Sequence, residues 1–350
     1  MALLRTLAVR ALTLVAVLLA VLVLLVISLG ATGVSDRLLH ARVGEDLRAL
    51  RGALAQTIRD TNELERTVEA RRKELEAFYN LDQPWYFRLP ANVGRVLTLD
   101  LGEARSLRSF SGSNRVSDIV LDRLPNTILL LTTSLIITAA IGLMVGVRLA
   151  TRVGSPLDRA VSYFSAISYA VPAWWMGILL ILIFAFQVHL FPSGGMYSTP
   201  PPEGAILRFF DLVRHALLPI LTLVLVSVGP YIYTVRTMTL NVAQEDHVLV
   251  ARAKGLPEGL LTYRHILRVA APPIVTGLIL ALAGSLGGAI LVETVFNWQG
   301  MGLLYYEAVA GTPDEGVIVA LTFVFTLLYV LARLVLEFLY VLLDPRVRYT

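Results

Sequence analysis

Few residues of this chain have the types and spacing that catalysis or metal binding requires. None of the five histidines stands in an H-E-x-x-H pattern or another metal-binding spacing. They are His40, His189, His215, His247 and His265. The chain has no cysteine, which excludes disulfides, thiol catalysis and cysteine metal sites. No serine lies in a nucleophile elbow. We therefore predict a protein that is not an enzyme and that holds no metal and no cofactor.

Phosphate-binding chemistry is also missing from the sequence. There is no G-x-x-x-x-G-K-[ST] loop, whose backbone N–H groups and lysine would hold the phosphates of a nucleotide. Lys73 and Lys254 are the only lysines, and Lys254 follows no glycine-rich loop. If ATP hydrolysis drives this protein, the hydrolysis takes place on another polypeptide.

The most informative spacing belongs to a polar, basic stretch, residues 243–276, between two apolar segments. The stretch is longer than a turn needs, and helix-compatible sequence flanks Gly255 on both sides. Glycine commonly ends a helix, and Pro257 suits the first turn of a second one. Pro272 and Pro273 are expected to close that second helix. We predict a helix–glycine–helix elbow that docks a partner protein. The alternative, an amphipathic helix lying on lipid, would need a cleaner apolar face.

Composition places this elbow in a membrane protein. Hydrophobic residues make up 56% of the 350 and charged residues 16%, against about 45–50% and about 25% in soluble domains. The mean hydropathy of +0.70 agrees. A bilayer core needs about 20 apolar residues per helix. Six segments qualify: Leu12–Leu29, Leu124–Val147, Ser162–Val188, Ala216–Val235, Pro273–Val292 and Val317–Leu343. The first is longer than the apolar core of a signal peptide and is interpreted as a retained helix.

Loop charges predict the orientation of these spans. Basic residues dominate loops 148–160 and 236–270, whereas loop 294–315 holds acidic residues and no basic one. By the positive-inside rule, both termini and the elbow are cytoplasmic. The net charge of +4 is explained by this bias and needs no nucleic acid. The predicted organisation is a first transmembrane helix at 1–30, an extracytoplasmic loop at 31–123, and a core of five transmembrane helices at 124–350 with the elbow at 243–272.

The extracytoplasmic loop contains a helical pattern of its own at 45–79. Leucines and other apolar residues form a heptad-like stripe there, with glutamate and arginine between them. We predict one helix over this segment. The segment is either a solvated hairpin or a helix packed on its own loop, or it is a docking surface for an external partner. The aromatic residues Trp85, Tyr86 and Phe87 that follow suit the level of the lipid headgroups.

Two groups of charged residues lie within or beside the apolar segments. Arg333 and Glu337 are four residues apart in the last span and are interpreted as a structural ion pair rather than a transport relay. Glu293 follows the fifth span, close to Phe296 and Trp298. These three residues form either a candidate outer gate or a cap of the junction between helix and loop, and the sequence leaves both interpretations open.

Several motifs occur together in a recognisable order. They are LDQPW (81–85), DLG (100–102), RLPNT (123–127), ARAKGL (251–256), YRHILR (263–268), ETVFNWQGMG (293–302) and LDPRVRY (343–349). With these motifs the chain resembles the membrane-spanning permease of an ATP-binding-cassette importer, of the peptide and nickel uptake family. It departs from the family where Leu249, Val250 and Ala251 replace a glutamate-alanine-alanine triplet, and where Gln299 replaces a proline.

The resemblance implies an all-α, polytopic membrane protein with six transmembrane helices and a cytoplasmic coupling helix. It implies that the elbow contacts an ATPase through Ala251, Arg252, Ala253, Lys254, Gly255, Leu256, Arg264, His265 and Arg268. The implied partners are a second, homologous permease, two cytoplasmic ATP-binding subunits, an extracytoplasmic substrate-binding protein and membrane lipid. The implied location is the inner membrane of a prokaryote.

Three classes of function remain to be weighed. The favoured one is an importer permease for peptides, with nickel chelates, glutathione or oligosaccharides as alternative cargo of the same kind of transporter. A self-sufficient secondary transporter would need intramembrane carboxylates or broken helices near the midplane, and the middle spans are predicted to carry almost none. A membrane-anchored sensor with the 45–79 helix as its input would leave the elbow and five spans unexplained.

Overall fold

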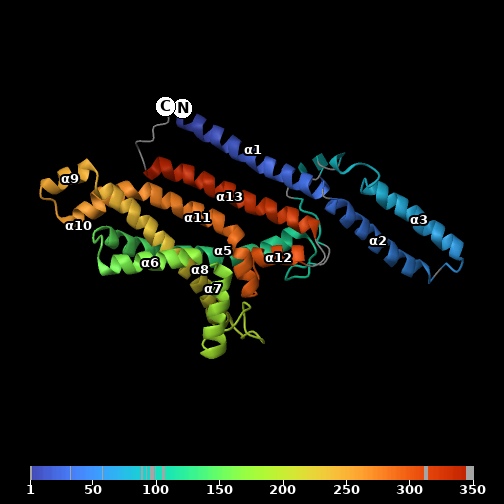
Figure 1. The fold of residues 1–350 in the computed structure, drawn as a ribbon. Coiled ribbons are helices and arrows are strands. Elements are labelled where there is room, and N and C mark those ends of the chain that lie inside the picture. The colour runs from blue at the N-terminus through green and yellow to red at the C-terminus, as the bar shows by residue number, and fades with distance from the viewer. Residues whose placement is uncertain are drawn as a thin grey trace. The chain divides into compact units, whose positions relative to one another are not determined.

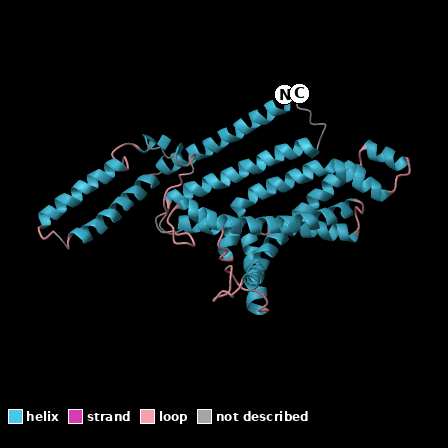
Figure 2. Ribbon diagram, turned by 180° about the vertical axis from the view of Figure 1, so that it is seen from behind, coloured by secondary structure: helices cyan, strands magenta, loops and turns pink. Residues whose placement is uncertain are grey.

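The computed structural model describes the chain except for residues 1, 32, 57, 88–89, 92, 95–97, 99, 105–106, 311–313 and 344–350 (Figure 1). Every regular element among the described residues is helical, apart from an isolated bridge between Glu103 and Arg115 (Figure 2). The prediction of an all-α protein is therefore confirmed. The motif LDPRVRY falls almost wholly outside the described residues, as does the Glu337 side chain of the predicted ion pair.

The elements follow one another along the chain in a simple order. They are α1 (Ala2–Ala31), α2 (Val34–Leu54), α3 (Thr61–Phe78), η1 (Trp85–Phe87), α5 (Val116–Ala150), α6 (Pro156–Ala170), α7 (Ala173–Leu180), η2 (Ile181–Gln187), α8 (Ala205–Ala243), α9 (Asp246–Ala253), α10 (Glu258–Leu260), η3 (Leu261–Leu267), α11 (Arg268–Val295), α12 (Met301–Ala310) and α13 (Glu315–Leu343). Helix η1 is a 3₁₀ turn, whereas η2 and η3 are π-helical.

Four helical stretches of the described residues are long and apolar enough to cross a membrane. They are Val116–Ala150, Ala205–Ala243, Glu258–Ala281 and Gly316–Leu336. The pair α6 and α7 with η2 makes a fifth if a bent pair counts as one span, and α1 carries a shorter apolar stretch at Leu12–Leu25. A polytopic helical membrane protein is thus confirmed, while the count of six spans stays a prediction.

The predicted span Ser162–Val188 is not one straight helix. Helices α6 and α7 meet at an angle of 102° across Val171 and Pro172. Val171 is extended, with φ −87° and ψ 121°, because the proline ring after it disfavours helical backbone. Proline also has no N–H for the helix ladder. The apolar composition was predicted correctly, but the direction of the chain changes within it.

The chain divides into two compact units. The first comprises residues 1–11, 121–306 and 328–350, and the second comprises 12–120 and 307–327. The predicted single helix at 45–79 belongs to the second unit and is wrong. Its place is taken by the hairpin of α2 and α3, which lie side by side (Figure 1).

A capping residue explains the break in that hairpin. Asp60 precedes α3 and accepts a hydrogen bond from the Asn62 N–H at 2.9 Å, which satisfies one free donor of the first turn. Glu63 three residues later completes the sequence pattern of a capping box. Arg51 of α2 pairs with Glu65 of α3 across the hairpin. The segment thus folds as a helical hairpin, while its extracytoplasmic location and a docking role for it stay predictions.

In the first unit, α5 and α6 each approach α8 closely at a glycine. A β-carbon on Gly146 of α5 would lie 2.8 Å from Val235 Cβ of α8. A β-carbon on Gly229 of α8 would lie 2.8 Å from Ser165 Cα of α6. Small residues at helix crossings allow such approach, and helix association in lipid relies on this packing. These contacts hold α5, α6 and α8 together beside the elbow.

Candidate functional site

The elbow lies at one end of α8 and α11 (Figure 1). Helix α8 ends at Ala243, and α9 begins at Asp246 after a two-residue turn. Helix α9 ends in a glycine motif, in which the Gly255 N–H donates to the Arg252 carbonyl at 3.0 Å and the Leu256 N–H donates to the Ala251 carbonyl at 3.4 Å. These are the two hydrogen bonds of a Schellman motif.

Gly255 has φ +76°, a conformation that favours glycine because a β-carbon would crowd the backbone. The expectation that Gly255 ends the first helix of the elbow is confirmed.

The second limb of the elbow differs from the prediction. Pro272 and Pro273 do not close it but lie inside α11, and α10, η3 and α11 follow one another without a break. Local π turns let membrane helices accommodate prolines, and η3 supplies such a turn just before them. The elbow therefore runs directly into a membrane helix, so that a displacement of the elbow displaces the start of α11.

A buried apolar cluster fastens the elbow to its neighbours. Val248 and Leu261 are fully buried between the two limbs, and Val235 of α8 packs against them. Further members of the cluster come from α5, α8, α9, η3 and α11: Val147, Val242, Ala251, Ile266, Ala270 and Ile274. Because protein interiors are close-packed, the elbow is anchored to these helices rather than loosely tethered.

The structure separates the predicted coupling residues into two sets. Ala251 is buried and Leu256 packs against the same cluster, so these two residues support the elbow from within. The exposed set is Arg252, Ala253, Lys254, Gly255, Arg264 and Arg268, whereas His265 is half-buried.

Arg252 has a partner within the elbow. Its Nε donates to Glu258 Oε1 at 2.8 Å and its Nη2 to Oε2 at 3.3 Å. The hydrogen bond to Glu258 raises the pKa of Arg252 above its ordinary value. The pair spans the Gly255 turn, so Arg252 braces the elbow as well as presenting charge.

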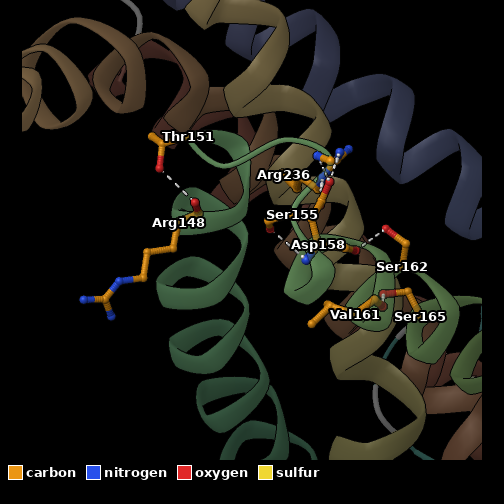
Figure 3. Close-up of polar contacts among 9 residues, drawn as sticks. Arg148, Thr151, Ser155, Asp158, Val161, Ser162, Ser165 and Arg236 are labelled. Atoms are coloured by element: carbon orange, nitrogen blue, oxygen red, sulfur yellow. Dashed lines mark hydrogen bonds and ion pairs between the residues drawn. The ribbon is translucent and has the colours of Figure 1, made fainter.

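A buried ion pair lies beside the elbow, and sequence reasoning missed it. Asp158 of α6 and Arg236 of α8 point toward each other (Figure 3). Arg236 Nε donates to Asp158 Oδ1, and Arg236 Nη2 donates to Asp158 Oδ2 at 2.8 Å. The Gly154 N–H also donates to Oδ2 at 2.9 Å, and Ser155 Oγ caps α6 by accepting from the Asp158 N–H. One carboxylate thus joins the turn between α5 and α6, the start of α6, and α8.

The sequence held part of the signal for this ion pair. Ser155 followed by a proline and by Asp158 is the pattern of a helix start. Nothing in the sequence indicated that Arg236, 78 residues further on, is the partner of Asp158. In the sequence, both residues lie in stretches that are predicted to be loops.

A second contact holds the other end of α6 on α8. Pro230 in α8 has no N–H, so it cannot donate to the Val226 carbonyl four residues earlier. The Ser168 hydroxyl of α6 lies 3.0 Å from that carbonyl and 2.5 Å from the Leu225 carbonyl. We call the two contacts together, Asp158–Arg236 and Ser168–Val226, the α6–α8 clamp.

The residues proposed as an outer gate form a packed junction. Glu293 is fully buried, as are Phe296 and Trp298. Glu293 Oε1 accepts from the Thr127 hydroxyl at 2.7 Å, and its Oε2 accepts from the Gly302 N–H at 2.7 Å, in the first turn of α12. A carboxylate is favourable at a helix N-terminus. These contacts favour the interpretation of Glu293 as a cap of the junction over that of a gate residue.

The fold defines a class of protein, namely a polytopic helical membrane protein with a helix–glycine–helix elbow between two of its membrane helices. Residues 140–349, three fifths of the chain, match the model of the family described as binding-protein-dependent transport system inner membrane component. The chain belongs to that family. It is a membrane permease subunit of an ATP-binding-cassette transporter and works in a complex with other subunits.

Individual relatives are similar over most of their length. The Bacillus subtilis (strain 168) oligopeptide transport system permease protein AppB is 31% identical over 281 residues, which cover 80% of this chain and 86% of the relative. The Pseudomonas aeruginosa (strain UCBPP-PA14) di/tripeptide transport system permease protein DppB is 31% identical, with 77% and 82% covered. The Sinorhizobium fredii (strain NBRC 101917 / NGR234) probable peptide ABC transporter permease protein y4tP is 36% identical, with 67% and 72% covered.

The elbow turn makes one prediction. We expect Gly255→Val to strain the turn by about 1–2 kcal/mol or more, the cost of left-handed backbone for a residue with a side chain, while the spans stay inserted. The transporter should assemble poorly, which co-purification of the ATPase subunits with the tagged chain measures. Gly259→Val is the matched control, since a β-carbon there meets no atom within 4 Å and φ is not positive. Equal ATPase recovery from both variants would rule out a special role for the turn.

The clamp makes a second prediction. Arg236→Gln leaves the Asp158 carboxylate buried without its cation, which costs about 3–5 kcal/mol in measured cases. The purified chain should melt at a clearly lower temperature than the native one. Arg159→Gln removes an exposed arginine one residue from Asp158 and should leave the melting temperature unchanged. Equal melting of the two variants would show that the ion pair contributes nothing.

Proposed function

We propose that this chain is the permease subunit of a peptide importer, and that the elbow is the surface through which ATPase subunits drive it. The observation that carries the proposal is the direct continuation of the elbow into α11, together with its buried anchorage on α8. Peptide cargo is supported by the relatives, whose names describe oligopeptide, di/tripeptide and D,D-dipeptide transport. Nickel chelates, glutathione and oligosaccharides are the alternative cargo.

The proposed complex follows from a permease without nucleotide-binding motifs of its own. Two ATP-binding subunits would contact the elbows from the cytoplasm through Lys254, Arg264 and Arg268, whose side chains are exposed. A second, homologous permease would complete the path, and an extracytoplasmic binding protein would deliver the peptide. ATP on one face and loaded binding protein on the other would then bias the same two-state equilibrium.

The α6–α8 clamp suggests how motion would spread within the chain. A push on the elbow moves α8 and α11, and the clamp makes α6 follow α8. The helical direction changes at Val171 and Pro172, so the block of helices that moves with the elbow would end there. This bend would then be the place where movement of the elbow reorients α7.

The bend is also relevant to the secondary-transporter alternative, for which intramembrane carboxylates or broken helices are expected. The structure does contain a broken helix, contrary to the expectation for the middle spans. Asp158, the carboxylate of α6, lies at the end of that helix away from the bend, and both of its oxygens are held by Arg236 and the Gly154 N–H, so it does not suit proton or ion exchange. The bend is therefore better explained as a mechanical feature of a driven permease.

Orientation is tested with the two lysines of a chain that has no cysteine. Lys254 lies in the predicted cytoplasmic elbow and Lys73 in the outer hairpin, and both side chains are exposed. In intact cells, a membrane-impermeant maleimide should label Lys73→Cys but should label Lys254→Cys only after lysis. Labelling of Lys254→Cys from outside would overturn the proposed topology.

Cargo is tested in cells that lack this chain. Uptake of labelled di- and oligopeptides should fall at least tenfold and should return when the native chain is expressed, whereas uptake of nickel should be unchanged. An unchanged peptide uptake with a loss of nickel uptake would transfer the proposal to the metal-chelate alternative.

A further inference from the structure

A cavity of about 320 Å³ lies in the segment that joins η2 to α8, apart from both the elbow and the clamp. Its size is at the lower end of the range for ligand pockets, about 300 Å³, and suits one peptide residue rather than a long chain. The lining contains one guanidinium and two imidazole rings, from Arg214, His189 and His215. It also contains the aromatic rings of Phe186 and Phe191.

The polar side of the cavity is held in place by a network around Asp211. The Asp211 carboxylate accepts from the Ser198 N–H and from the Ser198 hydroxyl, both at 2.8 Å. His215 is buried, and its Nδ1 lies 2.8 Å from the Asp211 carbonyl and 3.4 Å from the Asp211 carboxylate. The Asp211 carboxylate therefore already has hydrogen-bond partners in Ser198. The contact of Nδ1 with Asp211 fixes the orientation of the His215 ring and leaves Nε2 as its remaining polar atom.

Arg214 is the cation of this cavity. Its Nη2 donates to the Leu190 carbonyl at 3.4 Å, which is long for a hydrogen bond and occupies one of five N–H donors. The Arg214 side chain is exposed, so the guanidinium can receive a ligand. Its planar fork matches a carboxylate with two parallel hydrogen bonds. With Asp211 nearby, the single positive charge suits a monoanion better than a phosphate dianion.

Another part of the cavity lining is apolar. Phe186 is 60% exposed, and Phe191 packs against Phe184 with a ring distance of 6.3 Å. Aromatic rings and a guanidinium in the lining of one cavity fit a small ligand that carries one carboxylate beside an apolar side chain.

We propose that this cavity binds the C-terminal residue of a peptide, with its carboxylate on Arg214 and its side chain against Phe186 and Phe191. The proposal rests on the proposed peptide transport and deepens it, because it assigns to this chain a contact with the terminal carboxylate. Metal binding is the weaker alternative, since the described residues contain no group of three histidine, aspartate or glutamate side chains placed to hold an ion.

The test compares two probes on the purified full-length chain in lipid nanodiscs: alanyl-phenylalanine and its C-terminal amide. The amide lacks the negative charge and should bind roughly tenfold more weakly or worse, the typical effect of losing a charge-assisted hydrogen bond. Arg214→Gln should bind acid and amide equally. Phe186→Ala should weaken both probes while keeping the preference for the acid.

Arg208→Gln is the matched control. Arg208 lies in the same helix as Arg214 but stacks over the Tyr197 ring at 5.5 Å and does not line the cavity. This variant should keep the native preference for the acid. Equal binding of acid and amide to the native chain, an absence of saturable binding, or a preference that survives in Arg214→Gln would each overturn the cavity proposal.

Failure of the cavity and failure of peptide transport can be told apart. If cells lacking the chain lose peptide uptake but the native chain does not discriminate acid from amide, the cavity proposal is wrong and the transport function stands. If peptide uptake is normal in those cells, the proposed function is wrong whatever the binding experiment shows.

Discussion

The buried carboxylate of Asp158 is the constraint on which the arrangement around the elbow depends. A buried charge without a partner costs several kcal/mol, so Asp158 and Arg236 must stay together while the protein is folded. The carboxylate also accepts the Gly154 N–H, which holds the turn between α5 and α6. Helix α8 carries Arg236 and continues to the elbow. The Asp158 side chain therefore joins the α5–α6 turn, α6 and α8, and through α8 it is connected to the elbow.

Packing in the rest of the first unit supports the same block. Helices in lipid gain little from the hydrophobic effect and associate through close contact and hydrogen bonds. Gly146 and Gly229 allow that contact, and Ser168 supplies a hydrogen bond where Pro230 removes one from the α8 ladder. Because close-packed units do not deform continuously, a push on the elbow should move the block as a body. The change of direction at Pro172 then marks its limit.

The sequence predicted the elements that depend on local chemistry. The elbow and the geometry of Gly255 followed from helix-ending rules, and the all-α membrane fold followed from composition. The break before α3 was missed although Asp60 and Glu63 carried a capping signal, because the apolar stripe ran across it. The helix that continues through Pro272 was also missed, since the preceding π turn has no sequence signature.

Features that depend on contacts between distant segments could not be predicted. Asp158 and Arg236 are each ordinary loop charges in the sequence, and only the folded chain brings them together. The same holds for the cavity, because His215 and Arg214 acquire their setting from a loop that folds back on α8. The bend at Pro172 is intermediate: the proline is visible, but hydropathy counts apolar residues and does not report the direction of the chain.

The central claim is that the elbow, α8 and α6 move as one body. It is tested by the distance between spin labels at Leu249 of α9 and Tyr163 of α6, two exposed sites, in the assembled transporter with and without ATP. We expect the distance within one chain to stay constant while the distance between the two elbows of the complex changes. A shift of several ångströms between the two labels within the chain on ATP binding would contradict the claim, because the elbow would then move independently of α6.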